Sequence, residues 1–392
     1  MKILHLCLSA FYIEGMSYQE NLLPLFHQKM GHEVRIISSL QTFSSDGEYT
    51  YEEKATEYDN QYGIHVKKLD YKKPVKIARR IKTYIGTYQA IESFSPDIIF
   101  MHGIQFLDSR VVVRYMKKHP DVRLYADNHS DFSNSARNWV SKHIQHKILW
   151  RLCAQNMEPY VIKFWGVLPA RVDFLIDMYK LPEEKVDLLV MGADDEAVKS
   201  ASGSGLREQT RKKYGFADHA FLIVTGGKID QWKKQTLLLM DAVNQIADPD
   251  IQLLVFGSVT PELKEEVEKR CSGKVKYVGW VDSADSYSLF AAGDAACFPG
   301  RHSVFWEQVA GQGIPMICKF WAGTTHVDRG GNVIFLHEDS VQEISGAITK
   351  MKEEYSEFKS KAISAGPHFL YSKIAERSIE NEVSVRTQQI RR

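Results

Sequence analysis

Short apolar segments alternate with helix-like segments along the whole chain, and this alternation constrains the fold more than any other feature. In the first half the apolar segments are KILHLCL (2–8), EVRIISS (33–39), PDIIFMHG (96–103), VRLYADNHS (122–130) and VIKFWGVL (161–168). Such runs are typical of strands buried on both faces of a parallel sheet. Their repeated strand–helix order predicts a doubly wound α/β domain.

The second half of the chain repeats this pattern. Its apolar segments are AFLIVTGG (220–227), IQLLVFGS (251–258), KVKYVGW (274–280), DAACFPG (294–300) and PMICKF (315–320). Because 392 residues exceed the usual size of a single core, we predict two Rossmann-like domains facing across a cleft. We place them at residues 1–195 and 196–370, and we expect a C-terminal helix over 371–392 that packs back on the first domain.

Helical segments separate the predicted strands. Ser17 and Glu20 have the spacing of a capping box, which predicts a helix from Ser17 to Met30. Residues 74–94 and 132–160 are predicted to be basic helices. In the second half, helices are predicted over 234–246, 261–271, 283–293 and 306–312.

Composition excludes several classes of protein. The 50 basic and 49 acidic residues nearly cancel, so no global field favours nucleic acid. The five cysteines are scattered and form no C-x-x-C, which favours a reducing compartment. The sequence has no apolar window long enough to span a membrane, and the first apolar run is too short for a signal peptide. We expect a cytoplasmic protein.

Loops that follow strands carry the candidate site, because ligands of such sheets bind beyond the carboxyl ends of strands. Gly226, Gly227 and Lys228 follow one strand, and Lys233 and Lys234 precede the next helix. Glycines let backbone N–H groups approach a ligand, and lysines at an electropositive helix start favour a phosphate group. The alternative is a solvated lysine pair. Gly257 ends the following strand in the same way.

The loop FPGRHSVFWEQVAGQGIP (298–315) lies between a strand end and a helix start. Arg301, His302 and Ser303 can donate hydrogen bonds to phosphate oxygens, and Glu307 can accept two hydrogen bonds from a ribose diol. The alternative is that Glu307 only complements the helix dipole. No G-x-G-x-x-G follows the first strand and no P-loop motif occurs, which disfavours a dinucleotide or P-loop site.

His129 stands in the loop DNHSD (127–131), directly after a predicted strand. It is a candidate catalytic group or a hydrogen-bonding partner of a substrate hydroxyl, and the alternative is a solvated loop histidine. Asp127 and Asp131 beside it are weak evidence for a metal.

Taken in order, these segments resemble the GT-B glycosyltransferases, and within them the retaining family 4, over almost the whole chain. The resemblance is carried by MKILHLCL, SYQENLLP, MGHEVRII, PDIIFMHG, LPEEKVDLLVMGADD, TGGKIDQWKKQTLLLMDAV and VKYVGWVDSADSYSLFAAGDAACFPG. It implies two Rossmann-like domains and transfer of a glycosyl group from a nucleotide-diphosphate sugar, with retention of configuration.

The resemblance also implies roles for individual residues. Lys228 stands at the family's arginine position, and counting back from Ala242 puts Lys234 on the family's lysine, with Lys233 beside it. The resemblance implies that Lys233 and Lys234 both face the diphosphate of the donor. His129 matches the histidine near the donor sugar, and Gly15 matches the glycine of the first loop.

The loop 298–315 departs from the family's two glutamates. Counted back from Pro315, the second glutamate falls on Gln308, one residue after Glu307, and the first falls on Gly300. The contact that the family's first glutamate makes with the donor sugar then has no counterpart here. The candidates to replace it are Arg301, His302 and Ser303.

The function implied is a hexosyl-type glycosyltransferase of cell-envelope polysaccharide or glycoconjugate synthesis, without a cofactor or a metal. Its donor would be a nucleotide sugar and its acceptor a saccharide or a lipid-linked molecule. The basic helices of the first domain could contact a membrane peripherally, or could simply be solvated. Two other functions remain open: a GT-B epimerase or hydrolase of nucleotide sugars, and a non-catalytic nucleotide-sugar-binding protein.

Overall fold

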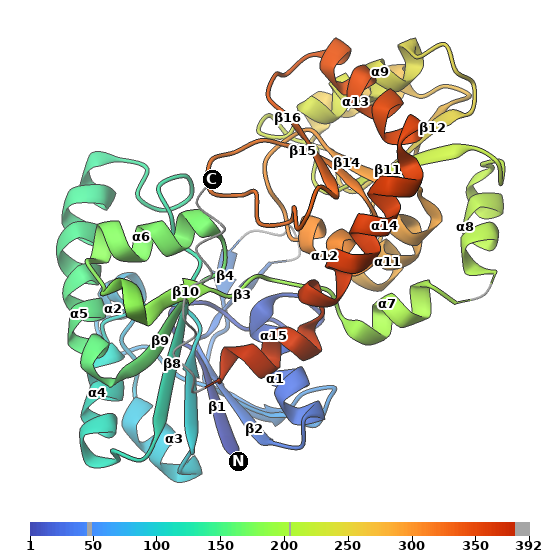
Figure 1. Cartoon of the computed structure of the whole chain (residues 1–392). Coiled ribbons are helices and arrows are strands. Elements are labelled where there is room, and N and C mark those ends of the chain that lie inside the picture. Colours follow the sequence, from blue (N-terminus) through green and yellow to red (C-terminus); the bar gives the residue numbers. More distant parts are fainter. Residues whose placement is uncertain (45–48, 204, 381–392) are drawn as a thin grey trace. The chain divides into compact units, whose positions relative to one another are not determined.

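The computed structural model describes residues 1–44, 49–203 and 205–380, and these form two compact units. The first unit is Met1–Leu189 together with the segment from Ala375, and the second is Val190–Ile374. Figure 1 shows the chain coloured along the sequence, with strands and helices alternating in both units. Among the described residues, none of the helices has the length and apolar character that crossing a bilayer requires.

The sheet of the first unit has the strand order β10-β9-β8-β7-β1-β2-β6-β5. Among the described strands its pairings are parallel apart from β5 with β6. The bounds are β1 Lys2–Cys7, β2 Glu33–Ser38, β5 Glu57–Asp59, β6 His65–Lys68, β7 Ile98–Met101, β8 Arg123–Asn128, β9 Val161–Gly166 and β10 Val186–Leu188; β3 (Gln41–Phe43) and β4 (Tyr49–Tyr51) form a separate antiparallel pair.

The sheet of the second unit is parallel, with the order β13-β12-β11-β14-β15-β16. Its strands are β11 Phe221–Gly226, β12 Ile251–Phe256, β13 Val275–Tyr277, β14 Ala295–Phe298, β15 Met316–Lys319 and β16 Val333–Leu336. The chain leaves β11 toward β12 on one side and returns to pair β14 on the other. This reversal makes the β11/β14 border the topological switch point of the sheet, where ligands of such folds bind.

Strand β11 shows why the second unit has two layers of helices. Phe221 and Ile223 belong to the core formed with α9, α10 and α13, whereas Leu222 and Val224 belong to the core formed with α11 and α12 (Figure 1). Successive strand residues point to opposite faces, so a continuous apolar run fills both layers. The helices of this unit are α7 Asp195–Ala201, α8 Leu206–Tyr214, α9 Gln235–Gln245, α10 Pro261–Arg270, α11 Ser283–Ala292, α12 Phe305–Gly311, α13 Val341–Glu353, α14 Tyr355–Ala365 and the 3₁₀ turn η4 Gly366–Phe369.

The helices of the first unit are α1 Gln19–Lys29, α2 Val75–Ile81, α3 Thr87–Phe94, α4 Ser109–Lys118, the π-helix η1 Ser141–Trp150, α5 Arg151–Met157 and α6 Pro169–Tyr179, with 3₁₀ turns η2 Glu158–Tyr160 and η3 Glu183–Lys185. Helix α1 begins later than predicted, because Tyr18 rather than Ser17 is its N-cap residue. The carbonyl of Tyr18 accepts the first helical hydrogen bond, from Leu22 N at 2.9 Å.

The prediction of one basic helix over 74–94 is wrong. Lys82 and Gly86 adopt positive φ angles of 57° and 80°, and the chain between them leaves the helical path. Tyr84 is thereby buried in the core, where its hydroxyl donates to Leu8 O at 2.7 Å and its N–H donates to Asp108 Oδ2 at 2.9 Å. Burial of this aromatic ring outweighs the local preference for a continuous helix.

Helix α15 (Tyr371–Ser378) contains the junction at which the chain re-enters the first unit. From Ala375 onward it contacts that unit: Trp165 Nε1 donates to Ser378 O at 3.0 Å, and Tyr125 Oη donates to Ile379 O at 3.0 Å. Of the segment predicted at 371–392, residues 381–392 lie outside the described residues.

Candidate functional site

A pocket lies at the switch point of the second sheet, where β11 and β14 end side by side. Ile223 of β11 is in register with Ala295 of β14, so the loops after Gly226 and after Phe298 leave the same edge. The pocket is lined by Thr225, Gly226, Gly227, Lys228, Ile229, Lys233, Thr236, Val255, Phe256, Phe298, Pro299, Gly300, Arg301 and Ser303. All of these residues belong to the second unit.

Glycine is required in the loop beside this pocket. Gly227 has φ 124° and Gly257 has φ 121°, values that other residues rarely adopt. A Cβ on Gly257 would lie 2.0 Å from the carbonyl oxygen of Gly227, so the two backbones could not approach each other. The close packing places backbone rather than side chain at the pocket wall, which is what a phosphate-binding loop requires.

Three cationic side chains line the pocket: Lys228, Lys233 and Arg301. Asp230 orders the loop that carries Lys233, because its Oδ1 accepts from the N–H groups of Trp232 at 2.9 Å and Lys233 at 3.1 Å. Burial of the ammonium group lowers the pKa of Lys233, and the charge of Asp230 offsets this in part. The guanidinium of Arg301 lies 4.6 Å from the centre of the Trp232 ring, an arrangement that fixes its position.

Lys234 is placed differently from its neighbour. It is exposed, it occupies the N-cap position of α9, and it does not line the pocket. The resemblance assigns the diphosphate contact to both Lys233 and Lys234, and in the structure Lys233 lines the pocket whereas Lys234 does not.

Glu307 is fully buried in the first turn of α12 and holds two imidazoles. Its Oε1 accepts from His302 Nε2 at 2.8 Å and from His326 Nε2 at 2.7 Å. Burial alone would raise the pKa of Glu307, but these two histidines hold it at about 2. The carboxylate is therefore ionised at neutral pH and fixes the orientation of both rings.

The same three side chains have the donor set of a metal site. One nitrogen from each histidine and one oxygen of Glu307 all lie within 4.8 Å of one another. Glu307 Oε2 is buried and has no hydrogen-bond partner among the described residues. The N–H···O contacts satisfy Glu307 Oε1, so the three side chains form a hydrogen-bonded triad in this structure.

In the first unit, Asp127 and His129 lie at the carboxyl end of β8. Asp127 is fully buried; its Oδ1 accepts from Gly103 N at 2.7 Å, and its Oδ2 accepts from His102 Nδ1 at 3.0 Å. His129 Nε2 lies 3.5 Å from the same Oδ2, and its side chain is 30% exposed. Burial alone would lower the pKa of His129, but the Asp127 carboxylate raises it. Burial would raise the pKa of Asp127, yet His129 and His102 hold it well below its usual range.

A chain of buried imidazoles continues from Asp127 into the first unit. His102 Nε2 lies 2.9 Å from His5 Nδ1, and His5 Nε2 lies 3.0 Å from His27 Nδ1. All three histidines are fully buried. Burial lowers the pKa values of His5 and His27, the latter to about 3.

Hydrogen-bond acceptors lie at both ends of this row of imidazoles. Asp127 is at one end, and at the other His27 Nε2 lies 3.0 Å from the carbonyl oxygen of Ala375 and 3.0 Å from Ser378 Oγ. The Ser378 hydroxyl donates to Ala375 O, so it too is an acceptor for His27. Asp127 and Ala375 O thus bound a row of three hydrogen-bonded imidazoles, in which each ring contacts a polar atom through both of its nitrogens.

Comparison with known proteins identifies the second unit. Residues 220–353 match the family model described as "Glycosyl transferases group 1". The second unit contains a group 1 glycosyltransferase domain. No curated protein sequence matches the chain.

Solved structures extend the likeness beyond this glycosyltransferase domain. A glycosyltransferase from Rickettsia africae is 13% identical with a TM-score of 0.66, and the match covers 96% of each chain. Anabaena HepE in complex with UDP is 16% identical with a TM-score of 0.65, covering 96% of this chain and 98% of that one. UDP-GlcNAc 2-epimerase from Neisseria meningitidis, bound to UDP-GlcNAc, is 14% identical with a TM-score of 0.64, covering 97% and 99%. These matches establish the GT-B fold that the sequence predicts.

The structure separates the predicted site residues into groups. Lining the pocket of the glycosyltransferase domain are Gly226, Gly227, Lys228, Lys233, Arg301 and Ser303. His302 and Glu307 form the triad with His326, and the buried Gln308 Nε2 donates to Ser286 Oγ at 2.7 Å. In the first unit, Gly15 is an exposed loop residue with φ 75°.

Sequence analysis missed several polar residues that the fold brings to these sites: His326, His5 and His27. His326 lies in a loop without a recognisable motif, and His5 and His27 stand inside apolar segments. The sequence offers one signal for His5 and His27. Each interrupts an apolar segment, and a histidine buried in such a segment needs a hydrogen-bond partner.

Proposed function

We propose that this protein transfers a glycosyl group from a nucleotide-diphosphate sugar to a saccharide or lipid-linked acceptor, with retention, in cell-envelope polysaccharide or glycoconjugate synthesis. The observation that carries the proposal is the pocket of the glycosyltransferase domain, where Lys228, Lys233 and Arg301 surround a glycine loop at the switch point. This combination of cations and accessible backbone suits a pyrophosphate.

In the proposed reaction the largest change in charge occurs on the leaving group. Breaking the bond between the anomeric carbon and the diphosphate oxygen puts negative charge on the departing nucleoside diphosphate. Lys228, Lys233 and Arg301 would stabilise that charge electrostatically. With three cations at the pocket, we propose that catalysis needs no metal, and activity should persist in EDTA.

His129 is the group that we propose for the donor sugar. Its Nε2 faces the Asp127 carboxylate, which raises its pKa, and this leaves Nδ1–H as the hydrogen-bond donor that we propose for a sugar hydroxyl. We propose that the buried His102 and Asp127 hold this ring in place and take no part in the bond-breaking step.

A ligand screen tests the proposal directly. Thermal shift with UDP, GDP and ADP and their sugars should raise Tm for one base, and UDP is the first choice because Anabaena HepE was crystallised with UDP. The sugar nucleotide that stabilises the protein should then lose its sugar to an acceptor. Absence of any shift at millimolar ligand would refute the proposal.

Nucleotide-sugar epimerisation or hydrolysis is the second candidate function. It is favoured by the Neisseria epimerase, which matches the fold as well as the glycosyltransferases do. UDP released from UDP-GlcNAc at the same rate with and without acceptor saccharides would support hydrolysis, and conversion of UDP-GlcNAc to an isomeric nucleotide sugar without net release of UDP would support epimerisation. Binding of the nucleotide sugar without turnover in either assay would instead indicate a non-catalytic protein.

A further inference from the structure

The helix that follows the His129 loop exposes a row of large apolar side chains. Val140, Ile144, Ile148 and Leu152 are spaced by four residues, and Trp139 precedes them. Their exposed fractions lie between 49% and 67%. The helix consists of the π-helix η1 and α5, and residues four apart lie close to the same face in both types of helix. We name these five side chains the apolar stripe.

The opposite face of the same helix already anchors it to the first unit. Trp150, Cys153, Ala154 and Met157 are buried in the core. The helix is also held by polar contacts, since His146 Nδ1 lies 2.8 Å from Tyr179 Oη. A helix that is apolar on both faces is normally buried all round. Folding of the unit therefore leaves the apolar stripe without a partner among the described residues.

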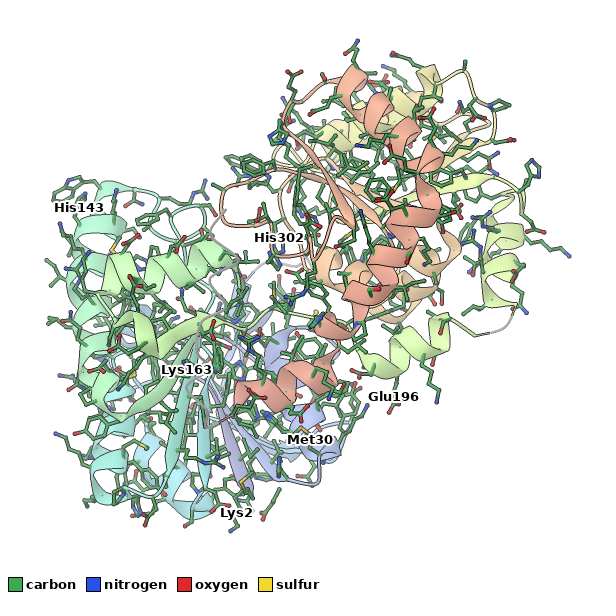
Figure 2. The ribbon with its side chains drawn as sticks, in the orientation of Figure 1. Lys2, Met30, His143, Lys163, Glu196 and His302 are labelled. Atoms are coloured by element: carbon green, nitrogen blue, oxygen red, sulfur yellow. The ribbon has the colours of Figure 1, made fainter. Side chains whose placement is uncertain are left out.

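The helix that carries the apolar stripe bears only basic charge. Residues 132–157 contain Arg137, Lys142, Lys147 and Arg151 and no aspartate or glutamate, although acidic and basic residues balance in the chain as a whole. Lys142 and Lys147 are exposed and form no ion pair within the part of the chain that the structure describes. In Figure 2, His143 lies at the margin of the first unit, directly before Ile144 of the apolar stripe.

We propose that the apolar stripe docks on the surface of an anionic lipid bilayer. Aliphatic side chains on one helix face enter the boundary between headgroups and acyl chains, and flanking lysines bind the anionic headgroups. Trp139 stands at the end of the stripe, and tryptophan favours this interface. The aliphatic side chains by themselves fit a protein partner as well as a bilayer. The helix has basic residues and no acidic residues, and this favours an anionic bilayer over a protein partner.

The inference rests on the proposed function in one respect, because it explains how a lipid-linked acceptor is reached. Trp139 follows His129 by ten residues, through a loop held by the bond from Ser141 Oγ to Ser135 O at 2.7 Å. Docking by the apolar stripe would bring the carboxyl edge of β8 to the bilayer. The acceptor is then taken from the membrane surface rather than from solution.

Co-sedimentation of the full chain with vesicles tests the inference. The protein should bind vesicles that contain phosphatidylglycerol and should bind pure phosphatidylcholine vesicles weakly. Ile144→Ser combined with Ile148→Ser should reduce binding by about tenfold or more, since two aliphatic side chains are lost from the interface. The matched control is Ile363→Ser, because Ile363 is 58% exposed on α14 of the second unit.

Further measurements separate membrane docking by the apolar stripe from misfolding of the variant and from self-association. The circular dichroism spectrum and the melting temperature of the double variant should equal those of the wild type, which shows that the first unit is folded. Its nucleotide affinity should also be unchanged, which shows that vesicle binding is independent of the donor site. Trp139 emission should shift to the blue with anionic vesicles, and the difference should vanish in Trp139→Phe. Equal vesicle binding by the double variant and the wild type would overturn the inference. So would a dimer in ultracentrifugation that the double variant abolishes.

Discussion

At the scale of single residues, neighbours in the sequence have different roles. Lys233 and Lys234 are chemically identical, yet only Lys233 lines the pocket at the glycine loop. Asp230 decides between them, because the turn that it orders directs Lys233 inward and leaves Lys234 exposed at the start of α9.

Replacing each of the two lysines by alanine tests this difference. Lys233→Ala should weaken nucleoside-diphosphate binding by about tenfold to a hundredfold, the usual cost of losing a charged hydrogen bond. Lys234→Ala should change the affinity little. Calorimetric titration of both variants with UDP gives the comparison, and equal losses in the two variants would refute the assignment.

Glu307 should make the second unit sensitive to acid. Its pKa is held at about 2 against an ordinary value of 4.5. The stabilisation is full above pH 4.5 and is lost as the pH falls toward 2, because the unfolded state then binds the proton more readily. The shift corresponds to about 3 kcal/mol.

Urea unfolding between pH 2 and pH 5 measures this effect. Over that range the free energy of unfolding should fall by about 3 kcal/mol more in the wild type than in Glu307→Gln. Glu208→Gln is the matched control, because Glu208 is exposed on α8 of the same unit. If Glu307→Gln and wild type showed parallel pH profiles, the triad would contribute nothing to stability.

At the scale of elements, the histidine chain joins β7, β1, α1 and α15 inside the first unit. His102, His5 and His27 are aligned by parallel pairing of β1 with β7 and by packing of α1 against the sheet. The end of α15 supplies the last acceptor, Ala375 O. A segment remote in sequence thereby completes a buried polar network, and such networks are costly when one member is missing.

His102→Gln tests the contribution of this network to stability. The substitution removes the imidazole that contacts both Asp127 and His5, so the protein should be destabilised by about 2 kcal/mol or more. Urea unfolding of the variant and the wild type at pH 7 measures the loss. A variant as stable as the wild type would show that the histidine chain adds nothing to stability.

At the scale of the whole molecule, each unit carries its own group of candidate residues. All residues that line the nucleotide pocket belong to the second unit, whereas His129 and Asp127 belong to the first. Binding of the nucleotide and reaction of the sugar should therefore respond to different substitutions.

His129→Ala tests this division of roles. Turnover should fall by about a hundredfold, a typical effect of losing a positioned histidine, while the Kd for the nucleoside diphosphate should stay at the wild-type value. Lys117→Ala, at an exposed position on α4 of the first unit, is the control for general disturbance of that unit. A parallel loss of nucleotide affinity in His129→Ala would show that the two functions are not separable.

Much of this architecture was predictable from the sequence, because strand and helix periods and turn residues are local properties. The alternating apolar runs predicted both parallel sheets, and Gly226-Gly227 marked a close backbone approach at the end of β11. The break within 74–94 was not predictable, because the burial of Tyr84 depends on Leu8 and Asp108 from other segments.

What the sequence determined by itself was the GT-B fold and the loops that carry the candidate site. Only the tertiary structure decided which side chains meet there: Lys233 instead of Lys234, His326 with Glu307, and three histidines in line with Asp127. The reason is that local chemistry fixes the period and the turns of a segment. Contacts between segments depend on strand order and on helix packing, which exist only once the chain has folded.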